Sequence, residues 1–240
     1  WILKTNLKTK NLQCGIHEPL DKKAHKKIIY SRKKCNELYN NCAGKHLAML
    51  TSCLVNNHGT LNYLDFNHPH QRNIRKVFNK FTETRLTKKN FSLDGCSAPQ
   101  YSFKIKSISK ALNNLIKSYN YEFEYTKPIR ILINSILKNP SYIGGTKSFD
   151  TKVMLTSKDK IFCKYGAEGV FLFAHFKKGI SGVVKIKDGN ERAIPVIIFN
   201  IFKKLKLMNN TELKNLEKKD QFLLKNHAGK KIGYINSTIK

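Results

Sequence analysis

The spacing of the apolar residues changes near residue 158, and this change limits the fold more than any other feature of the sequence. Before that point apolar residues recur at the spacing of amphipathic helices. After it, the segments Lys160–Lys164, Gly169–Phe176 and Ser181–Lys187 have the pattern of short strands joined by turns that contain glycine. Helices followed by an antiparallel sheet predict an α+β fold, with helices flanking the sheet.

Capping residues and prolines place the individual elements. Asp21 is a typical N-cap, and Pro69 and Pro128 suit the first turn of a helix. The predicted helices are Asp21–Leu38, a helix that starts within Gly44–Met49 and runs through Leu54, a helix entered at Pro69, Ser107–Tyr119, Lys127–Lys138, Phe149–Leu155 and Asn190–Leu207; a last strand is predicted at Lys231–Asn236. We interpret residues 1–240 as a single domain, helical over about 21–157 and formed by the sheet and a long helix over about 158–240.

The chain is strongly basic, with 45 Lys and Arg against 16 Asp and Glu and a formal charge of +29. Only six of these cations are Arg, and they are spread over the whole sequence, so we interpret the charge as a solvated lysine-rich surface without specific nucleic-acid binding. Binding to polyanions at low salt stays open as an alternative. No apolar run is long enough to span a membrane, and no secretion signal follows Trp1. We therefore expect a cytoplasmic protein whose six cysteines are reduced.

The densest group of reactive residues is Cys42, Lys45 and His46, which share one face if a helix begins there. A second cysteine, Cys96, follows Asp94 and Gly95 in a loop where glycine allows a sharp turn. Two thiolates and one nitrogen ligand suit zinc, with a carboxylate beside them. The alternative is a pair of buried thiols near a glycine turn.

Two residues of the predicted sheet also carry chemistry. Glu168 precedes an apolar strand and either faces a cleft or belongs to a simple turn. Lys185 lies near a strand end, where a lysine is solvated or, facing a pocket, acts as a base.

Several blocks of sequence, in this order, resemble the L-asparaginase II family, also called rhizobial-type or class 3. The resemblance covers essentially the whole chain, and its specificity comes from the consistent order of the blocks. The blocks are Asn40–His46, Asp65–Gln71, Asp94–Pro99, Asn139-Pro140 with Ile143–Gly145, Phe149–Thr151, Lys164–Val170, Val184–Gly189 and Asn226–Gly229.

This resemblance implies hydrolysis of the side-chain amide of L-asparagine to aspartate and ammonia, on a fold similar to serine β-lactamases. The family is thought to use serine–lysine pairs, in which a neutral lysine takes the proton of the attacking serine. It implies a homodimer and the following site residues: Cys42, Lys45 and Cys96 as zinc ligands, His46 and Asp94 as adjacent orienting residues, Lys185 in a second serine–lysine pair, and Gly95 and Glu168 at the substrate.

The sequence departs from the family pattern in one respect. The Ser-x-x-Lys helix and a further active-site serine of the family align before Trp1, so we expect this chain to match the carboxyl-terminal two-thirds, to lack the nucleophile and some strands, and to be inactive alone. Two other hypotheses compete: a non-catalytic basic fragment that binds polyanions or nucleic acid, and a structural zinc protein.

Overall fold

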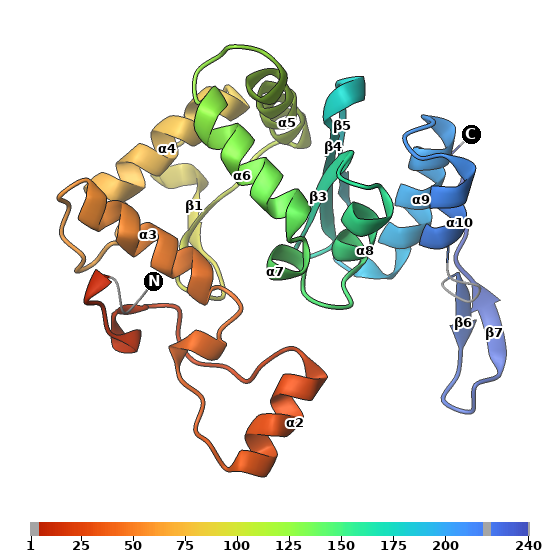
Figure 1. The fold of residues 1–240 in the computed structure, drawn as a ribbon, viewed down its shortest axis with the longest axis horizontal. Coiled ribbons are helices and arrows are strands. Elements are labelled where there is room, and N and C mark those ends of the chain that lie inside the picture. Colours follow the sequence, from red (N-terminus) through yellow and green to blue (C-terminus); the bar gives the residue numbers. More distant parts are fainter. Residues whose placement is uncertain (1–4, 218–221, 240) are drawn as a thin grey trace. The chain divides into compact units, whose positions relative to one another are not determined.

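The computed structural model describes residues 5–217 and 222–239 and divides into two compact units (Figure 1). Unit 1 is Trp1–Ser107 and unit 2 is Ile108–Lys240. The boundary lies within helix α5 (Ile105–Asn120), close to the start of that helix. The single-domain interpretation of the sequence stays a prediction.

Unit 1 is built around two helices and a short hairpin. Helix α3 packs against helix α4, and strands β1 and β2 form an antiparallel pair with Phe91 opposite Tyr101. Leu50, Cys53 and Tyr63 are fully buried in its core. The elements are the 3-10 turn η1 (Thr9–Asn11), α2 (Lys22–Ser31), η2 (Glu37–Tyr39), α3 (Ala43–Val55), α4 (Pro69–Thr82), η3 (Lys88–Asn90), β1 (Phe91–Leu93) and β2 (Pro99–Tyr101).

Local signals explain where the helices of unit 1 begin. Asp21 caps α2, because its Oδ1 accepts the N–H groups of Lys23 and Ala24. Pro69 occupies the first turn of α4, as predicted. The prediction that the first helix continues to Leu38 is wrong, because Arg32 adopts a left-handed conformation (φ 50°) that ends α2 at Ser31.

Unit 2 is a three-stranded antiparallel sheet with helices packed on it. The sheet has the order β3-β4-β5, and helices α6 and α8 contact β3 (Figure 1). Fully buried side chains from sheet and helices, among them Ile161, Phe171 and Phe202, make one continuous core. The further elements are α6 (Thr126–Lys138), α7 (Ser141–Gly144), α8 (Phe149–Thr156), β3 (Ile161–Gly166), β4 (Val170–His175), η4 (Phe176–Lys178), β5 (Ile180–Lys185), η5 (Glu191–Ala193), α9 (Ile194–Lys204), α10 (Asn210–Leu216), β6 (Leu223–Lys225) and β7 (Lys231–Tyr234).

The predicted α+β class is confirmed, and three details of unit 2 differ from the sequence interpretation. The helix predicted at Asn190–Leu207 is shorter, since α9 covers only Ile194–Lys204. A 3-10 turn precedes Ile194, and Lys206, just after the end of α9, has a left-handed backbone (φ 51°). The last strand does not extend the main sheet but pairs with β6 in a separate two-stranded sheet. Helix α10 was not predicted; its N-cap residue is Asn209. None of the described helices is both long and apolar enough to cross a bilayer.

Candidate functional site

The loop between β1 and β2 is shaped by the side chain of Asp94. Its Oδ1 accepts the N–H groups of Cys96 (2.8 Å) and Ala98 (3.0 Å), which folds the chain back within four residues. The prediction that Gly95 supplies the sharp turn is wrong, since Ser97 has the left-handed conformation (φ 65°) and Gly95 does not. A side-chain carbon at Gly95 would contact nothing within 4 Å, so the space over this glycine is open.

An ion pair joins this loop to the first turn of α3. Lys45 Nζ lies 2.9 Å from Asp94 Oδ2, with side-chain exposures of 45% and 22%. Partial burial would raise the pKa of Asp94, but hydrogen bonds from Cys96 and Lys45 outweigh it and lower that pKa to about 2. Desolvation acts to lower the pKa of Lys45, yet its bonds to Asp94 and Cys96 raise it to about 12. The site therefore presents a fixed cation and a fixed anion side by side at neutral pH.

The thiol of Cys96 lies at the centre of the site and is buried. His46 Nε2 is 3.2 Å from its sulfur, and Lys45 and Cys42 also interact with it. Burial, followed by the neighbouring carboxylate of Asp94, raises the pKa of Cys96 to about 11, although Lys45 acts in the opposite direction. All six cysteines are free thiols, as predicted.

His46 is fully buried, and its hydrogen bonds define which nitrogen carries the proton. Burial and the nearby charge of Lys45 lower its pKa to about 4, so the ring is neutral at pH 7. Tyr63 Oη accepts the N–H of Gln13 (3.0 Å) and lies 2.6 Å from His46 Nδ1. Cys96 donates its S–H to the Asp94 carboxylate, so its sulfur can only accept from the ring of His46. We therefore assign the ring hydrogen to Nε2, facing Cys96, and Tyr63 then donates its hydrogen to Nδ1.

Tyr63 is the residue of this site that the sequence analysis missed. It is fully buried, and burial raises its pKa to about 12, so its hydroxyl keeps its hydrogen. Gln71, in helix α4, donates from Nε2 to the carbonyl oxygen of Tyr63 (2.9 Å). The block Asp65–Gln71 thus reaches the site through Tyr63, and a tyrosine just before this block was the available signal.

Asn40 holds the entry to α3 in place. Its Nδ2 donates to the carbonyl oxygen of Cys14 (2.8 Å), and its Oδ1 accepts the N–H of Cys42 (2.8 Å). This buried amide holds Cys42 at the N-cap position of α3. The helix therefore begins beside Cys42, which is the condition on which the sequence analysis placed Cys42, Lys45 and His46 on one face.

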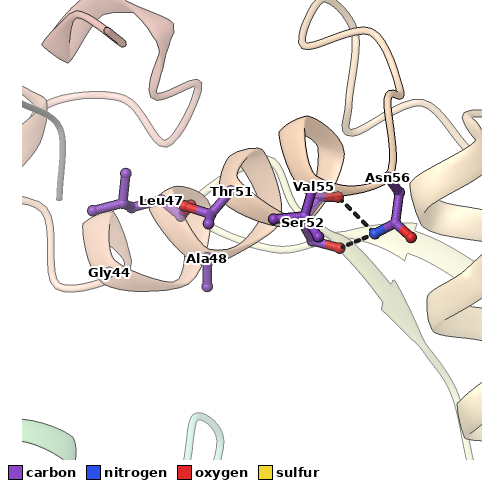
Figure 2. Close-up of a pocket in the computed structure, with 7 residues that line it drawn as sticks. All are labelled: Gly44, Leu47, Ala48, Thr51, Ser52, Val55 and Asn56. Carbon is purple, nitrogen blue, oxygen red and sulfur yellow. Dashed lines mark hydrogen bonds between the residues drawn. The ribbon is translucent and has the colours of Figure 1, made fainter. Parts of the chain in front are cut away.

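A cavity of about 580 Å³ runs along the exposed side of α3, beginning at Gly44 (Figure 2). Figure 2 shows Leu47, Ala48 and Val55 along it, and Asn56 turned back to bond Ser52. No charged side chain lines it among the described residues. Neither Lys45 nor Asp94 belongs to the lining of this cavity.

The metal prediction has one clear constraint. Over the ranges 5–217 and 222–239, no group of three or more His, Cys, Asp and Glu side chains is arranged to hold a metal ion. A set of three zinc ligands at this site therefore has to include the amine of Lys45 together with the thiols of Cys42 and Cys96. Sulfur and nitrogen donors are those that zinc takes in proteins, so the residues fit zinc by their chemistry.

The other two predicted site residues belong to unit 2. Lys185, at the end of β5, is exposed and donates from Nζ to the carbonyl oxygen of Ile186 (2.6 Å). Glu168 is exposed, and its backbone has the left-handed conformation (φ 58°). Its carboxylate packs so closely on Gly189 that a side-chain carbon added to Gly189 would lie 2.7 Å from Oε2. Glu168 therefore occupies a tight turn packed on the loop after β5, which is the turn alternative of the sequence analysis.

A comparison with protein families identifies the family of the chain. The family model described as L-asparaginase II matches residues 1–237. The chain belongs to the L-asparaginase II family, which places it among amidohydrolases resembling L-asparaginase. The comparison with curated proteins gave no match.

Proposed function

We propose that this protein binds L-asparagine over the site of unit 1 and serves its hydrolysis to aspartate and ammonia. The observation that carries this proposal is the ion pair of Lys45 and Asp94 beside Cys96. Asp94 pairs with an α-ammonium group, and Lys45 with a carboxylate, so the two fixed charges match the two charged ends of an amino acid. Family membership supports the amide as the bond that is broken.

We assign Cys42, Lys45 and Cys96 as the residues that would hold a zinc ion. Three protein ligands leave a fourth position open, as in catalytic zinc sites, and the bound ion would polarise a carbonyl oxygen. His46 orients Cys96 through its Nε2–H, and Asp94 fixes the loop that carries the sulfur. The high pKa of the Lys45 amine means that it must lose its proton on binding the metal. With zinc bound, the ion and not the Lys45 ammonium would supply the positive charge that faces the substrate carboxylate.

We propose the serine–lysine mechanism of the family for the chemical step, on a fold similar to serine β-lactamases. By resemblance to the family, the lysine of this mechanism is Lys185, which in its neutral form would accept the proton of a serine that attacks the amide carbon. Five Ser-x-x-Lys sequences occur in the chain, and they begin at Ser31, Ser107, Ser135, Ser157 and Ser237. The hydroxyl groups of Ser31, Ser135 and Ser157 donate to backbone carbonyl oxygens three or four residues earlier, which makes these serines poor nucleophiles, and Ser107 accepts from the Thr84 hydroxyl. We therefore propose that the 240-residue chain binds asparagine without turning it over.

Calorimetric titration of the chain with L-asparagine, with and without zinc, tests the binding step. We expect saturable one-site binding that Asp94→Asn abolishes and that Asp188→Asn, an exposed carboxylate of unit 2, leaves unchanged. No binding in either condition would overturn the proposed function.

Metal analysis and an ammonia assay test the other two parts. After dialysis against zinc we expect one ion per chain, lost in Cys96→Ser and retained in Cys35→Ser, whose thiol lies outside the cluster. Equal zinc in both variants contradicts the assigned ligands. Release of ammonia by the chain above a Cys42→Ala control would support amide hydrolysis and refute the missing nucleophile.

A further inference from the structure

A second cavity, of about 700 Å³, lies in unit 2 at the turn that joins β4 to β5. Its wall combines this turn with the end of α9 and the start of α10. Five lysines line it, together with one histidine. They are Lys160, Lys177, Lys178, Lys203, Lys206 and His175.

The lining is strongly unbalanced in charge. Glu212 is its single carboxylate among the described residues, and both oxygens are used: Oε1 lies 2.6 Å from Lys160 Nζ, and Oε2 accepts the N–H of Asn209 (2.9 Å). Lys160 is therefore compensated, and the other four lysines have no carboxylate in the lining. Like charges gathered around one cavity repel each other unless an anion occupies it.

His175 adds a hydrogen-bond donor to this lining. Its side chain is nearly inaccessible (3% exposed), and Nδ1 accepts the N–H of Lys178 (3.3 Å). The hydrogen of the neutral ring is then on Nε2, for which the described residues provide no acceptor. Burial, and next the charge of Lys178, lower the pKa of His175, so the neutral donor form is the one present at pH 7.

We propose that this cavity binds a small molecule that carries two or more phosphate groups. Lysine ammonium groups are point charges suited to phosphate oxygens, and the neutral ring of His175, in the same lining, supplies one further N–H donor. The volume is that of a small-molecule site, whereas a duplex would need an extended basic surface. The apolar part of the lining, Leu207, Met208 and Leu213, leaves room for a carbon skeleton. This site does not depend on the proposed asparagine site, because all its residues belong to unit 2.

Titration calorimetry with inorganic tripolyphosphate at about 150 mM salt tests the proposal. The variant Lys177→Gln/Lys203→Gln removes two lining charges, and Lys26→Gln/Lys27→Gln removes two exposed charges from α2 in unit 1. We expect one site per chain, at least tenfold weaker in the first variant and within twofold of the parent in the second. Both pairs are on the surface, and circular dichroism checks that both variants are folded.

Three results would overturn the proposal. Equal weakening in both variants would mean that binding follows the total charge. Several weak sites per chain would mean the same. If duplex DNA binds more tightly than tripolyphosphate and displaces it, the cavity is part of a nucleic-acid surface. Competition by orthophosphate only at far higher concentration than tripolyphosphate would support the requirement for more than one phosphate group.

Discussion

The two units use their buried residues in different ways. In unit 1, reactive groups lie within the core, because Cys96, His46 and Tyr63 are buried against one another. In unit 2, the core is apolar and continuous, and the family blocks lie at its edges, where Asp150, Gly144 and Gly169 hold the backbone. The blocks therefore differ between the units in what they hold together: polar and thiol side chains in unit 1, and the backbone around Asp150 in unit 2. Mutations in each unit test this difference.

The largest effect is expected for Asp150→Ala in unit 2. This fully buried carboxylate accepts hydrogen bonds from the backbone N–H groups of Thr151 (2.8 Å) and Tyr165 (3.1 Å) and from the Ser148 hydroxyl. Removing it leaves buried donors without an acceptor, which lowers the free energy of unfolding by about 3 kcal/mol. Urea unfolding followed by circular dichroism measures this loss.

The exposed carboxylate Asp65 in unit 1 provides the control for Asp150. Asp65→Ala is expected to change the free energy of unfolding by less than about 0.5 kcal/mol. Hydrogen exchange read peptide by peptide assigns the loss to a unit, and faster exchange confined to unit 1 in Asp150→Ala would contradict the structural role given to this residue.

The next effect contrasts two glycines. A side-chain carbon at Gly144 would overlap Asp150 Oδ1 and Thr151 Oγ1, so Gly144→Ala is expected to destabilise the protein by about 2 kcal/mol. At Gly44, in α3, the same carbon meets nothing within 4 Å, and Gly44→Ala is expected to stabilise it by about 0.5 kcal/mol. Thermal unfolding of both variants gives the comparison, and effects of the same sign would contradict it.

The sequence predicts the elements better than the site, for a physical reason. Helix starts depend on local groups such as Asp21 and Pro69, and the alternating strands of unit 2 need only a period of two. The early end of α2 depends on the left-handed Arg32, which no sequence signal marks. The sequence likewise does not indicate that β7 pairs with β6 and not with the three-stranded sheet, because strand pairing depends on tertiary contacts.

The candidate site shows the same limit. Spacing predicted that Cys42, Lys45 and His46 share one helix face, and the loop around Gly95 offered Cys96 and Asp94 as their partners. Tyr63 was missed because its contact with His46 spans 17 residues and depends on how the segment before α4 folds. Contacts of this kind arise from tertiary packing, which periodicity and capping do not encode.

A smaller effect is expected from Tyr63→Phe in unit 1. The change removes the acceptor for Gln13 and the partner of His46 Nδ1 without changing the ring, at a cost of about 1 to 2 kcal/mol. The readout specific to this role is the tautomer of His46. Nitrogen-15 chemical shifts should report the Nε2–H form in the parent and a mixture of tautomers in the variant.

A control variant and the tautomer of the parent protein test this assignment. Tyr101→Phe is the matched control, because that hydroxyl lies near Arg75 rather than His46 and should leave the tautomer unchanged. A parent protein with the hydrogen on Nδ1 would contradict the assigned direction of the Tyr63 hydrogen bond.

The smallest effect is the acid dependence contributed by Glu212 in unit 2. Burial acts to raise its pKa, but hydrogen bonds from Lys160 and the Asn209 N–H outweigh this and hold the pKa below its ordinary value of 4.5. A carboxyl with a lowered pKa stabilises the folded state above its ordinary pKa, and this contribution disappears as the pH falls below it.

At pH 7 we expect Glu212→Gln to be less stable than the parent by about 1 kcal/mol, a value limited by the partial exposure of Lys160. The two proteins should converge in urea unfolding below about pH 3, because a protonated carboxyl and an amide then make comparable bonds. A difference that stays constant from pH 7 to pH 3 would mean that Glu212 acts through its shape at the start of α10 and not through its charge.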